Sequence, residues 1–240
     1  MILWVLAVTF VSTLVRATLG FGNALVAMPL LAIILRIQIV TPLVALLALT
    51  ISLMILLRDW RQAYFQTAGK LTFFSLLGIP VGLLLLKGSY DAVVKIALAL
   101  TVIGFSLFNL IDPERLSLKT DRTAYIFGFI AGILGSAYNT HGPPIVIYGN
   151  LRKWPPESFR ATMQSYFLAT GILIVAAHGV AGLINREVLR YFLISLPAAA
   201  MAVVGGNRLN RLIPRGKFDR YVHLCLIGIG IMLLIRTLRH

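Results

Sequence analysis

Residues 123–151 read TAYIFGFIAGILGSAYNTHGPPIVIYGNL, a long apolar stretch that is broken by NTHGPP at 139–144. Residues 1–35 are also apolar and are broken by GFGN at 20–23, shortly after Arg16. Gly, Asn and Pro disfavour the interior of a membrane helix unless the backbone unwinds there. Each stretch is therefore predicted to be a broken-helix hairpin, with two helices joined at a tip inside the bilayer.

The composition of the whole chain is that of a membrane protein. Of the 240 residues, 59% are hydrophobic and only 12% are charged, and the mean hydropathy is +0.90. Soluble domains carry about 25% charged residues, whereas a membrane span needs about 20 mostly apolar residues. We predict an all-α integral membrane protein with six further spans, at 38–57, 70–87, 92–111, 162–181, 188–207 and 221–238.

The net charge of +14 does not indicate a nucleic-acid partner. The Lys and Arg residues are scattered over short connections between apolar runs, as expected for loops at a membrane surface, so the expected partner is the lipid bilayer. The apolar N-terminus lacks the basic region and cleavage site of a signal peptide and is expected to be retained. Cys225 is the single cysteine, so no disulfide can form within one chain.

The same order of elements occurs twice along the chain. A hairpin at 1–35 and three spans make up a first repeat, 1–111, and a hairpin at 123–151 and three spans make up a second, 123–240. Residues 112–122 form the linker. Few identical residues recur between the two halves. They include the pairs Gly22 and Gly142, Val26 and Val146, and Gly82 and Gly206, over which the offset grows from 120 to 124 residues.

The distribution of Lys and Arg tests the direction of the hairpins, because cytoplasmic connections carry an excess of these residues. If each broken segment crossed the membrane once, the two sides would carry 10 and 11 of them. If each segment returns to its starting side, the connections at 58–70, 112–122, 152–160 and 208–220 together carry 14, and the opposite side carries 7. The bias favours hairpins, a cytoplasmic linker and both termini outside.

A returning hairpin plus three spans gives each half an odd number of crossings, so the two halves are predicted to be inverted relative to each other. Inverted repeats whose broken helices meet near the midplane are typical of transporters. In this arrangement the two hairpin tips face one central site. Each tip leads into the start of a returning helix, whose free N–H groups and positive dipole end suit an anion.

The substrate-binding residues predicted at the tips are Gly20, Phe21, Gly22, Asn23, Asn139, Thr140, His141 and Gly142. Glycine lets a ligand approach the backbone closely. The alternative is that these glycines only allow tight packing between helices. His141 is a candidate for binding substrate or carrying a proton, or else a hydrogen-bonding residue of the tip.

Arg16 is the one formally charged residue inside either broken segment. A cation within the bilayer is costly and marks a functional candidate, here a counter-charge for an anion; the alternative is a side chain that snorkels or caps its helix. Gln164 and Ser165, early in an apolar span, are candidates for lining the cavity or for bonding a neighbouring helix. His178 and His223 are expected to be packing residues.

The glycine-rich patch early in each half carries a family resemblance. The first patch is LGFGNA at 19–24, followed by Pro29, and the second is GILG at 132–135, followed by HGPP at 141–144. With the chain length and repeat layout, these patches resemble the sulfite exporter TauE/SafE family, also called the toluene sulfonate uptake permeases. The resemblance implies a carrier of sulfur-containing oxyanions in the bacterial inner membrane. Asn23, Ala24 and His141 depart from the glycines and small residues of that family.

These observations lead to one main functional hypothesis, a secondary transporter of sulfite or an organosulfonate. The sequence contains no nucleotide-binding loop, no HExxH and no pair of cysteines, so no cofactor or metal is expected and the driving force is expected to be the membrane potential or an ion gradient. Two alternatives stay open, an anion channel and a membrane enzyme or partner protein of sulfur metabolism. The sequence does not decide between a monomer and a homo-oligomer.

Overall fold

The computed structural model describes residues 1–59, 63–87, 91–110, 118, 120–212 and 217–238, and the described residues contain helices and turns but no strand. Most of the predicted linker 112–122 lies outside the described residues. The first half contains α1 (Ile2–Leu19), α2 (Asn23–Ala32), α3 (Ile37–Asp59), α4 (Phe65–Lys87) and α5 (Asp91–Leu110). The second half contains a short 3-10 turn (Asp121–Thr123), α6 (Ala124–Tyr138), α7 (Gly142–Leu151), α8 (Pro156–Val180), α9 (Arg186–Leu212) and α10 (Lys217–Leu238).

The all-α prediction is therefore confirmed, and so is the presence of several helices suited to a bilayer. Five of the described helices are long and apolar enough to cross a membrane, at Ile2–Leu19, Ile37–Leu57, Phe65–Lys87, Ser158–Val180 and Arg186–Asn210. Four of them coincide with predicted spans. The predicted spans 92–111 and 221–238 also form helices, α5 and α10, whose searched apolar parts are shorter than a full span.

The helix α1 differs from expectation, because it was predicted as one arm of a hairpin and is nonetheless long enough to cross alone. Its 18 residues extend about 27 Å at 1.5 Å per residue, close to the thickness of a hydrocarbon core of about 30 Å. The second arm, α2, has 10 residues and extends only about 15 Å. The first hairpin thus has one long and one short arm.

Two glycines turn the chain between α1 and α2. Gly20 ends α1, and its N–H donates to the carbonyl of Arg16 at 2.7 Å. Gly20 and Gly22 have φ values of 88° and 99°, a left-handed conformation that glycine adopts without strain. The indole Nε1 of Trp4, near the start of α1, donates to the carbonyl of Leu30, near the end of α2, at 3.2 Å. The α2 helix therefore runs back toward the start of α1.

The second hairpin has a similar construction with an asparagine at the turn. Asn139 ends α6 with a φ of 54°, and its N–H donates to the carbonyl of Gly135 at 2.8 Å. Asn is among the few residues other than glycine that tolerate this conformation. The ring centroids of Phe127, early in α6, and Tyr148, late in α7, lie 5.4 Å apart. Both broken segments therefore fold back on themselves.

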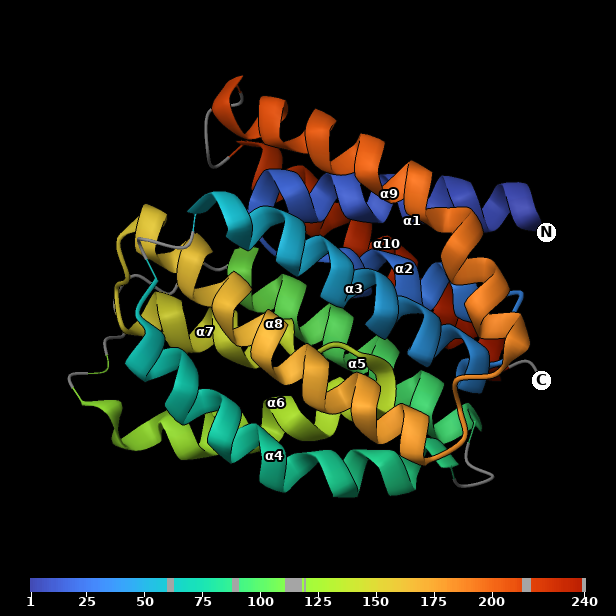
Figure 1. Ribbon diagram of the computed structural model, residues 1–240, viewed down its shortest axis with the longest axis horizontal. Helices are drawn as coiled ribbons and strands as arrows, with labels where there is room; N and C mark the ends of the chain where they lie inside the picture. The colour runs from blue at the N-terminus through green and yellow to red at the C-terminus, as the bar shows by residue number, and fades with distance from the viewer. Residues whose placement is uncertain (60–62, 88–90, 111–117, 119, 213–216, 239–240) are drawn as a thin grey trace.

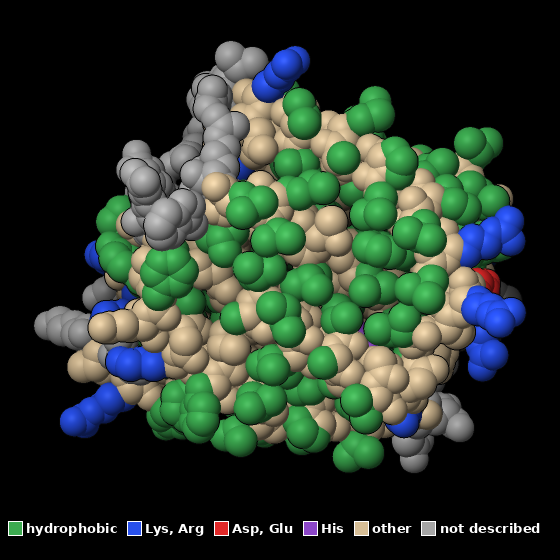
Figure 2. All heavy atoms as spheres, viewed as in Figure 1, with side chains coloured by type: hydrophobic (Ala, Val, Ile, Leu, Met, Phe, Trp, Pro, Cys, Tyr) green, Lys and Arg blue, Asp and Glu red, His purple; other side chains and the backbone are tan. Residues whose placement is uncertain are grey.

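The outer surface has the charge distribution that a bilayer requires. Figure 1 shows the start of α1 and the end of α10 at one end of the molecule, while α3 and α9 end and α4 begins at the opposite end. In Figure 2, Lys and Arg side chains gather at these two ends, and hydrophobic side chains cover much of the surface between them. An apolar band between two basic ends is the pattern of a protein that spans a membrane.

Close contacts at glycines hold two helix pairs together. In the pair α4 and α6, a Cβ atom on Gly132 would lie 2.8 Å from the Cα of Ser75. In the pair α1 and α9, a Cβ atom on Gly206 would lie 2.9 Å from the carbonyl oxygen of Leu14. Small residues let transmembrane helices approach this closely. Gly132, which belongs to the second glycine-rich patch, therefore serves helix packing and not the hairpin tip.

We expect Gly132→Ala to destabilise the protein and Gly104→Ala to leave it as stable or slightly more stable. The added methyl at position 132 meets the backbone of α4, and overpacking of this kind costs about 1–3 kcal/mol. Gly104 is also helical, but a Cβ there meets no atom within 4 Å, and alanine favours a helix. Thermal unfolding in detergent measures both; equal melting temperatures for the two variants would contradict the packing argument.

Candidate functional site

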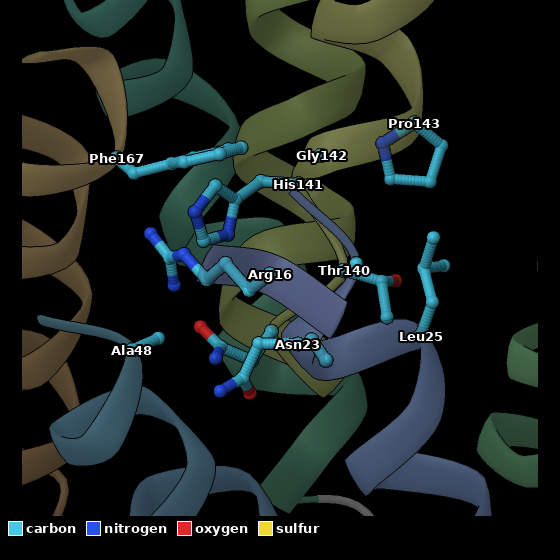
Figure 3. Close-up of a pocket in the computed structure, with 12 residues that line it drawn as sticks. Arg16, Asn23, Leu25, Ala48, Thr140, His141, Gly142, Pro143 and Phe167 are labelled. Atoms are coloured by element: carbon cyan, nitrogen blue, oxygen red, sulfur yellow. The ribbon is translucent and has the colours of Figure 1, made fainter. Parts of the chain in front are cut away.

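A cavity lies between the two hairpin tips (Figure 3). Its volume is about 20 Å³, room for a single water molecule. Seven of the eleven predicted substrate-binding residues line it, although they come from both halves of the chain. The complete lining is Arg16, Gly22, Asn23, Ala24, Leu25, Ala48, Asn139, Thr140, His141, Gly142, Pro143 and Phe167.

Arg16 supplies the positive charge of this cavity. It lies in the last turn of α1 with 3% of its surface exposed. Its Nη2 donates to Ser52 Oγ of α3 at 2.5 Å and to Gln164 Oε1 of α8 at 3.0 Å. Its guanidinium carbon lies 4.9 Å from the centroid of the Phe167 ring, a cation–π contact. All three partners are neutral, so an anion in the cavity would balance a charge that these described partners leave uncompensated.

Gln164 connects Arg16 to the first tip. While its Oε1 accepts from Arg16, its Nε2 donates to the carbonyl of Gly20 at 2.6 Å. The Gln164 side chain is fully buried. Both of its hydrogen bonds are therefore shielded from bulk water, which makes them electrostatically stronger. Gln164 and Gly20 therefore position the site without lining the cavity.

His141 contacts the same aromatic ring as Arg16, that of Phe167. It precedes the first turn of α7 and is 4% exposed. Its ring centroid lies 4.9 Å from that of Phe167 and 5.9 Å from that of Tyr166, both edge to face. Figure 3 shows the imidazole of His141 beside the guanidinium of Arg16, with Phe167 next to both. The single helix α8 thus packs against side chains from both hairpins.

Several buried polar atoms around the cavity have no hydrogen-bond partner among the described residues. They are the Nε of Arg16, both amide atoms of Asn23, the Nδ2 of Asn139, the Oγ1 of Thr140 and the Nδ1 of His141. All five side chains are at most 4% exposed and line the cavity. Burying such an atom without a partner costs about 1–3 kcal/mol, and buried polar atoms are normally paired. Their concentration at one place indicates a site built for a polar ligand.

The starts of the two returning helices are chemically unequal. The first turn of α2 contains Asn23, Ala24 and Leu25. The N–H groups of these residues have no carbonyl acceptor within the helix, because they lie at its start. In α7, Pro143 and Pro144 occupy the first turn and carry no N–H. The prediction that both tips offer free backbone donors therefore applies more fully to the first tip than to the second.

Two other predicted residues lie away from the cavity. The Phe21 ring contacts the rings of Phe105 and His223, with centroids at 5.9 and 6.5 Å, so it packs the first tip against α5 and α10. Ser165 donates to the carbonyl of Ala161 within its own helix at 3.0 Å. His178, expected to be a packing residue, has its Nε2 2.9 Å from the carbonyl oxygen of Ser136.

Five residues that line the cavity were not predicted to bind substrate, namely Ala24, Leu25, Ala48, Pro143 and Phe167, and neither was Ser52, which bonds Arg16. Phe167 follows Gln164 by three residues, which places both on one face of α8, so the helical spacing was an available signal. Ser52 and Ala48 lie one turn apart on α3 within an apolar run, and no pattern in the letters distinguishes them.

Comparisons with known proteins identify the family of this chain. The family described as Sulfite exporter TauE/SafE matches residues 5–233. The Probable inner membrane transporter protein TsaS of Comamonas testosteroni is 31% identical over 105 residues, 43% of this chain and 44% of that protein. The Probable sulfite/organosulfonate exporter TauE of Cupriavidus necator is 22% identical over 181 residues, 74% of this chain and 69% of that protein.

No solved structure matches this chain. The stretch shared with the Comamonas protein is less than half of either chain, whereas the family match extends over nearly all 240 residues. The protein therefore belongs to the TauE/SafE sulfite exporter family, whose members are membrane transporters and not enzymes.

Proposed function

We propose that this protein is a secondary transporter that moves a small sulfur-containing anion, sulfite or an organosulfonate, across the cytoplasmic membrane through the cavity between the two hairpin tips. The observation that carries the proposal is the buried Arg16, which faces this cavity with its Nε unpartnered. The name of the Cupriavidus relative, a probable sulfite/organosulfonate exporter, supports the choice of substrate class.

The lining suits a sulfur oxyanion chemically. Sulfite and sulfonate groups present three oxygens that accept hydrogen bonds, and the cavity offers donors from three directions. The Arg16 Nε comes from α1, the Asn23 Nδ2 from the first tip, and the Asn139 Nδ2 and Thr140 Oγ1 from the second. A guanidinium fork is well matched to a planar pair of oxygens. Binding would therefore satisfy several of the buried atoms at once.

The small cavity fits a carrier that is closed around its binding site. At about 20 Å³ it has room for a single water molecule, and sulfite already has four heavy atoms. The site must open to admit its substrate, which fits a protein that exposes one site alternately to the two sides of the membrane. A channel would instead need a continuous path at the moment of conduction.

The proposed architecture is a pair of inverted repeats, each a hairpin followed by three membrane helices. Support comes from Figure 1, in which the equivalent helices α3 and α8 run in opposite directions along the molecule, as do α4 and α9. The helix pairs also correspond between halves, since α1 packs on α9 while α6 packs on α4. Together with the 14 basic residues on one side, this arrangement supports the proposal that both termini lie outside the cytoplasm.

A reporter fused after His240 should be active outside the cytoplasm, and a reporter fused after Lys119 should be active inside. The expected result follows from the two-to-one excess of Lys and Arg on the side of the linker. Paired alkaline phosphatase and fluorescent-protein fusions at both positions give the measurement. Activity of both fusions on the same side would rule out the inverted arrangement.

Purified protein in liposomes should transport labelled sulfite and organosulfonates in preference to carboxylates and cations, and should show counterflow. Gly142→Leu should abolish this transport, because a Cβ at Gly142 already lies 3.7 Å from Phe167 and the rest of the side chain would fill the cavity. Gly104→Leu, on the outer face of α5, should transport normally. Flux without counterflow would indicate a channel, and normal flux through Gly142→Leu would place the path elsewhere.

Replacing Arg16 should weaken anion binding more than it weakens the fold. Loss of a charge partner for a desolvated anion costs about 2–5 kcal/mol, so Arg16→Gln should lower affinity at least about 25-fold. Arg16→Lys, which keeps the charge without the fork, should lower it less. Arg36→Gln, an exposed change between α2 and α3, is the matched control. Binding and melting temperature are measured on the same samples; a large fall in melting temperature with unchanged affinity would make Arg16 a structural residue.

A further inference from the structure

The side chains around the cavity contain one fixed cation and one group that can become a second. Arg16 faces the cavity from α1 and His141 from the second tip. The remaining ionisable side chain in contact with His141 is Tyr166 of α8, whose hydroxyl lies 2.8 Å from Ser75 Oγ. Among the described residues, α3 and α2 contribute no ionisable group to the lining. Asn23, Asn139 and Thr140 do not ionise near neutral pH.

We propose that His141 adjusts the charge of the site to the charge of the anion, staying neutral when a monovalent sulfonate binds and taking up one proton when a divalent sulfur oxyanion binds. This inference rests on the proposed function, because it concerns the same anion site. It assigns His141 a role in selecting the charge of the substrate, beyond general contact with it.

The physical reason is the cost of an unbalanced charge in a buried site. Arg16 and His141 are 3% and 4% exposed, so charges between them are weakly screened by water. One guanidinium balances a monovalent anion. A divalent anion leaves one negative charge over, and the nearest group able to offset it is the imidazole, which lies beside the guanidinium (Figure 3). Without an anion, the neighbouring guanidinium opposes a second positive charge at the same place.

The hydrogen-bonding state of His141 fits this role. Its Nδ1 is buried and has no hydrogen-bond partner in the part of the chain that the structure describes. A neutral imidazole has one donor and one acceptor nitrogen, whereas the protonated ring has two donors. Proton uptake therefore adds a donor to a site that must hold an acceptor-rich anion. His178 is equally buried, but its Nε2 lies 2.9 Å from the Ser136 carbonyl oxygen and it does not line the cavity.

A consequence concerns the charge that crosses the membrane in each cycle. A monovalent sulfonate carries one negative charge, and a divalent anion accompanied by one proton also carries one net negative charge. The membrane potential then acts equally on both substrates, and the proton gradient acts only on the divalent one.

Calorimetric titration of the purified protein with ethanesulfonate and with thiosulfate tests the inference, since these anions keep charges of one and two near neutral pH. Titrations in two buffers of different ionisation enthalpy report the protons taken up. We expect about one proton per thiosulfate and none per ethanesulfonate. His141→Gln, which keeps a polar side chain, should lower thiosulfate affinity at least about tenfold more than it lowers ethanesulfonate affinity. His178→Gln should change neither affinity.

The possible results distinguish a failure of the proposed transport function from a failure of the role of His141 alone. If neither anion binds the wild type, the proposed function fails and this inference fails with it. Binding of ethanesulfonate alone, or of thiosulfate without proton uptake, keeps the proposed function and overturns the role of His141. If His141→Gln weakens both anions equally and lowers the melting temperature, His141 is a structural residue of the tip, and the inference is likewise wrong.

Discussion

Within a bilayer every backbone N–H and C=O needs a partner inside the protein, and this constraint governs the two places where the chain leaves its helices. At the first tip the N–H of Gly20 donates to the carbonyl of Arg16, and the carbonyl of Gly20 accepts from the Gln164 side chain. At the second tip the N–H groups of Asn139 and Thr140 reach back to α6. The surrounding helices keep both tips away from lipid, so the same helices enclose the irregular backbone and the polar cavity.

The helix α8 is the element on which both tips depend. Within four residues it contributes Gln164 to the first tip and Tyr166 and Phe167 to the second. Arg16 in turn bonds α3 and α8 together through neutral groups. Movement of either hairpin therefore changes the contacts of the Arg16 guanidinium. A carrier needs such a coupling between binding and conformation.

The sequence predicts the breaks in the helices better than the lining of the site. Runs of Gly, Asn and Pro between apolar stretches identified the tips within a residue or two, because these residues act on their own backbone. The ring of Phe21, a predicted substrate-binding residue, packs against Phe105, because the direction of a side chain at a left-handed turn depends on its neighbours. Ser52 and Phe167 were missed for the same reason. They reach the site through the packing of α3 and α8, which cannot be predicted from a local sequence pattern.

The two prolines at the start of α7 make the halves of this transporter thermodynamically unequal. In the proposed mechanism, an anion that shifts toward one tip or the other as access alternates would meet several backbone amides at α2 and few at α7. The intrinsic affinity on the two sides of the membrane then differs. Such a difference leaves unchanged the substrate gradient at which net flux stops, because that gradient is set by the membrane potential and any coupled ion gradient. It determines instead at what concentration each side saturates, and hence the direction in which the protein works fastest.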